Sequence, residues 1–90
     1  KGTVMNALYR IAGGKAEAME FQVSSATRNL KVPLKDLKLR RGVLVAVIVR
    51  ENKVIIPEGS TCLEQGDDVI VIARDSGILD LNDIYEGGGS

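Results

Sequence analysis

The stretch VLVAVIVRENKVIIPEGS, residues 43–60, carries most of the fold information in this sequence. Seven apolar residues run unbroken over Val43–Val49, which is typical of a strand that is covered on both faces. Glu51-Asn52-Lys53 then predicts a tight reversal, because asparagine tolerates the left-handed backbone conformation that such turns need. Residues 54–56 would form the return strand, which Pro57 would end. We therefore expect a β-hairpin in the middle of the chain.

Three further elements flank this hairpin. In residues 16–24 the apolar side chains alternate with polar ones, which indicates a half-buried strand. Pro33 favours the first turn of a helix, so a single helical turn is expected over residues 34–38. The apolar run at residues 69–73 follows the turn signal Gly66-Asp67 and predicts a last buried strand.

The two ends of the chain are expected to differ from this central part. Within residues 1–14, Val4, Ala7, Leu8 and Ile11 have helical spacing, so we expect a connector helix from a preceding domain. Residues 75–84 would form a short terminal helix or an irregular segment, and residues 85–90 a flexible tail or linker. The expected fold is a small α+β domain over residues 15–84, with a mainly antiparallel sheet and short helices.

Composition excludes several classes of partner. Twelve basic and twelve acidic residues cancel, and the chain has only three aromatic residues. A nucleic-acid binder normally needs a strong basic patch, so no nucleic-acid partner is expected. The longest apolar run is far too short to span a membrane, so no direct membrane insertion is expected. The single cysteine, Cys62, cannot form a disulfide within the chain.

The residue types also argue against catalysis and against a metal site. There is no histidine, which removes the commonest general base and zinc ligand. Cys62 therefore has no base to activate it, and a buried thiol is the simpler interpretation. Asp67 and Asp68 are adjacent, so in a strand they would point to opposite faces. Asp80 and Asp83 are too few oxygen ligands for a metal ion. We expect no enzyme activity.

Arg50 leaves two interpretations open, because it stands where a buried strand meets a turn. It is either a solvated residue at the end of the hairpin or a contact for an anion, since its planar guanidinium suits phosphate and stacks on flat rings. In the second case, its apolar neighbours would suit a nucleotide-like ligand or an edge for self-association. The second face of Val43–Val49 also needs a cover, and a partner chain is an economical one.

The sequence resembles a known family in an ordered set of motifs. These are EAMEF, VPLKDLKL, GVLVAVIVR, KVIIPEG and GDDVIVI, which lie between residues 15 and 74. Together they are similar to the C-terminal regulatory domain of TrkA-type potassium uptake proteins, the TrkA-C or RCK-C domain.

The resemblance implies a dimeric regulatory domain in the cytoplasm, peripheral to the inner face of the cell membrane. Such domains belong to rings that gate a membrane potassium-translocating subunit of the Trk or Ktr type. NAD or ATP binds a separate Rossmann-like domain in these proteins, so no cofactor is expected in this part of the chain.

Some members of this family bind cyclic di-AMP at the dimer interface, in a site of apolar residues and an arginine. By position, the resemblance gives Leu44, Ile48, Arg50 and Ile56 as the corresponding ligand-binding residues. The alternative is a dimerisation module without a ligand, in another cation transporter or in an antiporter regulator.

Overall fold

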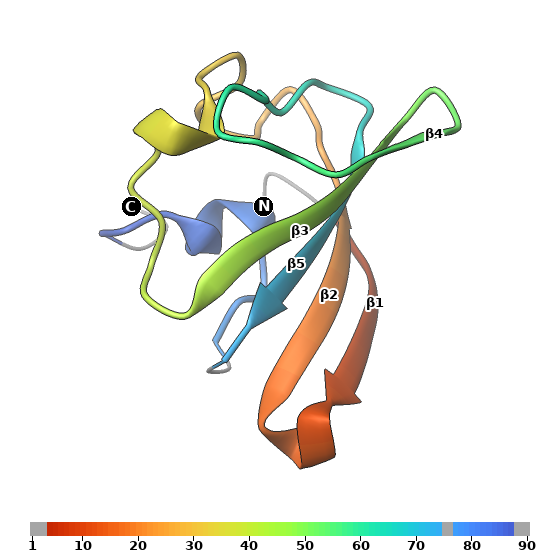
Figure 1. Cartoon of the computed structure of the whole chain (residues 1–90), viewed down its shortest axis with the longest axis vertical. Helices are drawn as coiled ribbons and strands as arrows, with labels where there is room; N and C mark the ends of the chain where they lie inside the picture. The colour runs from red at the N-terminus through yellow and green to blue at the C-terminus, as the bar shows by residue number, and fades with distance from the viewer. Residues whose placement is uncertain (1–3, 75–76, 88–90) are drawn as a thin grey trace.

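The computed structural model describes residues 4–74 and 77–87, in which five antiparallel strands form one sheet (Figure 1). The order of strands across the sheet is β1-β2-β5-β3-β4, so β5 is the central strand although it comes last in the chain. The strands are β1 Val4–Ile11, β2 Ala16–Gln22, β3 Val43–Arg50, β4 Lys53–Ile55 and β5 Asp68–Ala73.

The helix expected near the N-terminus is wrong, because Val4–Ile11 forms the edge strand β1. This strand pairs with β2 from Val4 opposite Gln22 to Ile11 opposite Ala16, with a register shift between Met5 and Ala7. The shift changes which side chains share a face, so the apolar spacing of the strand resembles that of a helix. A 3-10 turn, η1 (Ala12–Gly14), joins the two strands.

The central hairpin is confirmed. Arg50 and Lys53 form its closing pair, and the two residues between them, Glu51 and Asn52, have φ of 51° and 65°. Positive φ at both turn residues is the pattern of a type I′ turn, whose twist matches that of the flanking strands. The return strand β4 covers Lys53–Ile55, one residue earlier than expected.

A bulge at Ala46 determines which side chains of β3 face the core. The register on β5 shifts between Val45 and Val47, so Ala46 is the extra residue. Before the bulge Val45 faces the core, and after it Ile48 does, three positions later. The strand therefore presents apolar side chains on both faces, as the unbroken apolar run predicts.

The connecting segments cover only one face of the sheet, and the core lies between them and the strands. Leu63, Ile78, Leu81 and Ile84 come from these segments and are fully or almost fully buried against β2, β3 and β5. The helical turn expected after Pro33 is the 3-10 turn η2 (Leu34–Asp36), and the terminal segment contains the 3-10 turn η3 (Leu81–Ile84).

The α+β class is therefore confirmed only in part. The antiparallel sheet is as expected, but every helical segment in the described residues is a 3-10 turn of three or four residues. Tyr85, which we assigned to a flexible tail, is 4% exposed and bridges to Leu39, so it belongs to the folded domain. None of the helices in the described part of the chain is long and apolar enough to cross a membrane.

Candidate functional site

The face of the sheet away from the core, which we call the outer face, is built from three rows of side chains. Strand register gives these rows, because residues that are paired across neighbouring strands point to the same side. The rows are Tyr9-Ala18-Ile72-Leu44, Ala7-Glu20-Ile70-Val47 and Gln22-Asp68-Val49-Val54. The first row is apolar throughout, and the acidic side chains lie in the other two.

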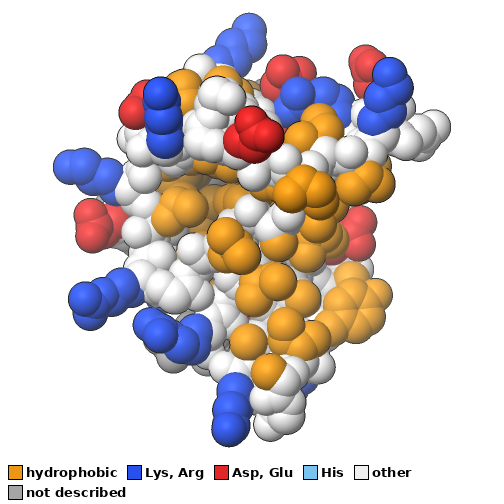
Figure 2. All heavy atoms as spheres, viewed as in Figure 1, with side chains coloured by type: hydrophobic (Ala, Val, Ile, Leu, Met, Phe, Trp, Pro, Cys, Tyr) orange, Lys and Arg blue, Asp and Glu red, His pale blue; other side chains and the backbone are white. Residues whose placement is uncertain are grey.

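Much of this apolar surface is accessible. Leu44 is 58% exposed, and Tyr9 and Val54 are also among the exposed large hydrophobic residues. Figure 2 shows apolar side chains gathered over the strands, whereas the lysine and arginine side chains project mainly around the margin of this view. Contiguous exposed apolar surface on a soluble domain is typical of an interaction site. No connecting segment of the described residues covers these rows, so the second face of β3 remains available to a partner.

A groove of about 250 Å³ adjoins this surface at Leu44. Leu34, Leu39 and Pro57 provide most of its apolar lining, and Lys35 and Glu58 contribute one charge of each sign. The groove arises because β4 pairs with β3 only over residues 48–50, after which the chain turns away from the strand. It can accept an apolar group that approaches beside Leu44.

Arg50 lies at the other end of β3, in an ion pair with a buried carboxylate. Its Nε and Nη2 donate to the two carboxylate oxygens of Asp67, each at 2.9 Å, and Nη2 also donates to the carbonyl of Cys62 at 2.8 Å. Asp67 is 1% exposed, and its Oδ2 also accepts a hydrogen bond from the backbone of Glu64. The hydrogen bond to this carboxylate raises the pKa of the Arg50 guanidinium, and desolvation opposes the increase. Arg50 thus anchors the turn before β5.

The structure does not bring the four predicted ligand-binding residues together. Leu44 lies on the outer face, and Ile56 is exposed just beyond β4. Ile48 is 0% exposed in the core, so it cannot contact a ligand in this structure. Arg50 points to the core side of β3, opposite to Leu44, because it follows Ile48 by two residues in the strand. The four residues therefore do not form a single surface within one chain.

The sequence analysis missed the partner of Arg50. We assigned Asp67 to turn chemistry alone, and it does occupy a turn, where its backbone donates to the carbonyl of Glu64. Its side chain, however, accepts from an arginine 17 positions earlier. The one signal in the sequence is that Gly66-Asp67 precedes a strand while an arginine ends another strand. This signal predicts the ion pair only weakly, because the sequence does not show that the two strands are neighbours.

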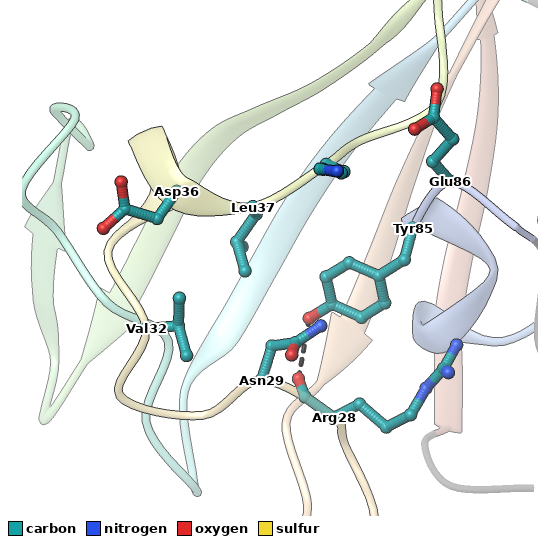
Figure 3. A pocket seen from close by; sticks show the side chains of 8 residues that line it. Arg28, Asn29, Val32, Asp36, Leu37, Tyr85 and Glu86 are labelled. Atoms are coloured by element: carbon teal, nitrogen blue, oxygen red, sulfur yellow. Dashed lines mark hydrogen bonds between the residues drawn. The ribbon is translucent and has the colours of Figure 1, made fainter.

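A second cavity, of about 290 Å³, lies beside Tyr85 (Figure 3). The Tyr85 hydroxyl donates to the carbonyl of Arg28 at 2.8 Å, and the Arg28 guanidinium lies 5.6 Å from the centre of the ring. The carboxylates of Asp36 and Glu86 point away from the ring in this view. Small-molecule sites usually have polar groups that converge on the ligand, so this cavity has the features of a packing gap rather than a ligand site.

Ionisation of Tyr85 should also make the stability of the fold depend on pH in the alkaline range. Burial raises the pKa of its phenol, although Asn29 and Arg28 oppose the increase. A group with a raised folded pKa stabilises the fold below its unfolded pKa, and this contribution is lost as pH rises through the folded value. The free energy of unfolding should therefore fall above about pH 10, the ordinary pKa of tyrosine. Chemical denaturation at increasing pH gives the free energy of unfolding for the wild type and for Tyr85→Phe. The same decrease of this free energy with pH in both proteins would contradict the prediction.

The described residues contain no group of three or more histidine, cysteine, aspartate or glutamate residues that could hold a metal ion. Asp83 has a structural role instead, because its Oδ2 accepts hydrogen bonds from the backbones of Leu79 and Asp80 at the start of η3.

Comparison with known proteins finds relatives among the Trk system potassium uptake proteins. Trk system potassium uptake protein TrkA homolog 2 of Methanosarcina mazei is 32% identical over 85 residues, which are 94% of this chain and 19% of that protein. The TrkA homolog of Archaeoglobus fulgidus is 32% identical over 74 residues, or 82% of this chain and 17% of that protein.

A second kind of relative is the K(+)/H(+) antiporter NhaP2 of Shewanella oneidensis, which is 36% identical over 69 residues, or 77% of this chain and 12% of that protein. The chain thus spans a fifth or less of the length of these relatives. The family model of the TrkA-C domain matches residues 18–85, from β2 to Tyr85. The chain belongs to the TrkA-C domain family.

Proposed function

We propose that this chain is a non-catalytic, dimer-forming regulatory domain of a potassium transport system. It acts on the inner face of the cell membrane, on a potassium-translocating subunit. The outer face of the sheet carries the proposal, because it exposes an apolar row on a domain whose core is already complete on the other side. Membership of the TrkA-C family, and relatives named for potassium uptake and for K(+)/H(+) exchange, support the transport assignment.

A second copy of the chain is the partner that this surface fits. A stable interface buries about 800 Å² on each partner. One chain exposes 5535 Å², so such an interface takes about a seventh of its surface. A two-fold dimer uses the same patch on both copies, so the apolar row would pack against itself. Asp68, which lies in the row at one end of the outer face, would remain at its polar rim.

Regulation in this proposal acts through the geometry of the dimer. A ligand changes an equilibrium between two arrangements only by the difference in its affinity for them. We infer that an anionic nucleotide such as cyclic di-AMP is the ligand, and that it approaches Arg50 at the end of the hairpin. A second candidate is a dimerisation module without a ligand, in a cation transporter or antiporter. It is favoured by the hydrogen bonds that already join Arg50 to Asp67 and Cys62.

The dimer is tested by one substitution on the outer face. Leu44→Glu places a charge in the apolar row, and we expect it to raise the dimer dissociation constant by about 10- to 100-fold. Sedimentation over a concentration series should give twice the 9.7 kDa of one chain for the wild type, and dissociation of the variant at much higher concentrations.

Leu79→Glu is the matched control, because Leu79 is 77% exposed but lies outside the sheet. It should leave the dissociation constant unchanged. A wild-type chain that remains monomeric at all concentrations would refute the dimer, and equal effects of the two glutamates would refute the assignment of the interface to the outer face.

A further inference from the structure

The outer face carries one acidic side chain at a position that the proposed dimer would bury. Glu20 stands in the second row, where Ala7 on β1 and Ile70 on β5 are its neighbours. It is half-buried in the single chain, and within residues 4–74 and 77–87 it has no ion pair. A carboxylate that loses its water at an interface without gaining a counter-ion destabilises that interface. The partner that fits this face therefore brings a cation to Glu20.

Arg74 is a cation at the margin of the same face. It follows Ala73, which is 1% exposed on the core side, so its side chain points to the outer side. Its backbone N–H donates to the carbonyl of Gly42 at 2.9 Å, which continues the pairing of Val43 with Ala73 by one rung. A Cβ atom on Gly42 would lie 3.1 Å from Nε of Arg74, so the guanidinium lies along the sheet. The side chain is exposed, and no ion pair holds it there in the described part of the chain, so it can turn toward an acid of a partner.

Glu20 and Arg74 lie on opposite sides of the apolar row. On β5, Ile72 belongs to the apolar row, and it stands at equal spacing from Ile70, which shares the row of Glu20, and from Arg74. A two-fold axis that lies along the apolar row, perpendicular to the strands and between two facing sheets, exchanges the two flanking rows. It places Arg74 of each chain over the partner's Ile70, with the partner's Glu20 on the next strand. Neighbouring strands are about 4.8 Å apart, which is within the reach of an arginine side chain.

We propose that the dimer has this two-fold axis, and that Arg74 of each chain forms an ion pair with Glu20 of the partner. The inference rests on the proposed dimer through the outer face, and it adds the orientation of the two chains and the contact that selects it. The apolar row still packs against itself. On β2, the partner's Ala16 would lie opposite Glu20, and its small side chain leaves room for the carboxylate and the guanidinium.

A two-fold axis parallel to the strands does not pair these charges. It places every row over the same row of the partner. Glu20 would then meet only its own row, in which the other residues are apolar, and Arg74 would meet only its own rung. Both axes bury the same apolar row, so the charges distinguish between them. Complementary charges across an interface fix its register in this way.

Charge reversal tests the ion pair. Glu20→Arg and Arg74→Glu each place like charges at both copies of the contact, so we expect each to raise the dimer dissociation constant by about 10-fold or more. The double variant Glu20→Arg/Arg74→Glu restores opposite charges, and its dissociation constant should return to within about 3-fold of the wild-type value. Sedimentation over a concentration series measures the constants, after circular dichroism has shown that each variant keeps the sheet.

The matched control combines Glu20→Arg with Arg41→Glu. This variant also keeps the net charge of the wild type, but Arg41 is an exposed residue of the turn before β3. It should dimerise as weakly as Glu20→Arg alone. If it recovered dimerisation as fully as the double variant with Arg74→Glu, only the net charge would matter, and the ion pair would be refuted.

The remaining outcomes separate this inference from the proposed function. If Leu44→Glu dissociates the dimer but neither charge reversal weakens it, this orientation is refuted and the dimer through the outer face stands. If both charge reversals weaken the dimer and the double variant recovers nothing, the pairing of Glu20 with Arg74 is refuted. If the wild-type chain is monomeric at all concentrations, the proposed dimer and this inference fail together.

Discussion

Arg50→Ala should lower the free energy of unfolding by about 3 kcal/mol, because it leaves the carboxylate of Asp67 buried without its counter-ion. Breaking one partner of a buried pair costs about 3–5 kcal/mol, and the lower end applies because the Arg50 side chain is 26% exposed and water can reach it. For a domain of this size the melting temperature should fall by about 15 °C. Urea denaturation at one fixed protein concentration measures the effect, since dimerisation also changes apparent stability.

Two further variants separate the ion pair from the loss of a long side chain. Arg41→Ala removes an exposed arginine from the turn before β3, and it should change stability by less than about 0.5 kcal/mol. Asp67→Asn combined with Arg50→Met removes both charges, and it should recover part of the stability lost in Arg50→Ala. If Arg50→Ala lowered the free energy of unfolding by less than about 1 kcal/mol, the buried carboxylate of Asp67 would not need Arg50 as its counter-ion. It follows that Arg50→Ala is a poor test of ligand binding, because it weakens the fold itself.

Tyr85→Ala should lower the free energy of unfolding by about 4 kcal/mol, although this residue lies near the end of the chain. The ring is buried with Leu81 and Ile84 in the core, and deletion of a large buried aromatic side chain typically costs about 3–5 kcal/mol. The backbone around it is also paired, since Arg40 donates to the carbonyl of Ile84 at 2.8 Å. Thermal unfolding followed by circular dichroism measures the change.

Tyr85→Phe is the matched control for this prediction. It keeps the ring and removes only the hydroxyl that donates to the carbonyl of Arg28, so a loss of about 1 kcal/mol is expected. Equal losses for the two variants would assign the effect to the hydrogen bond, and no loss in either would contradict the burial of this segment.

Several elements of the fold can be predicted from the sequence because their signals are local. The central hairpin is predicted because Glu51-Asn52-Lys53 separates two apolar runs and Asn52 tolerates positive φ. In the structure the turn is one residue shorter, and Glu51 and Asn52 both adopt positive φ. The strands β2 and β5 follow from alternation and from an apolar run. The resemblance to TrkA-C domains was also available from the motifs, and the family model confirms it over residues 18–85. In each case the controlling interactions lie within a few residues of one another, so a short window of sequence contains them.

The conformation of Val4–Ile11 and the arrangement of the candidate site could not be predicted from the sequence, because they depend on tertiary contacts. The apolar spacing of Val4–Ile11 fits a helix, but its pairing with β2 and the shift in register make it a strand. Arg50 is separated by 17 positions from Asp67, and the sheet alone brings them together, because β3 and β5 are neighbours. The bulge at Ala46 likewise sends Ile48 into the core while Leu44 stays on the outer face. These outcomes depend on contacts between distant segments, and local preference does not encode such contacts.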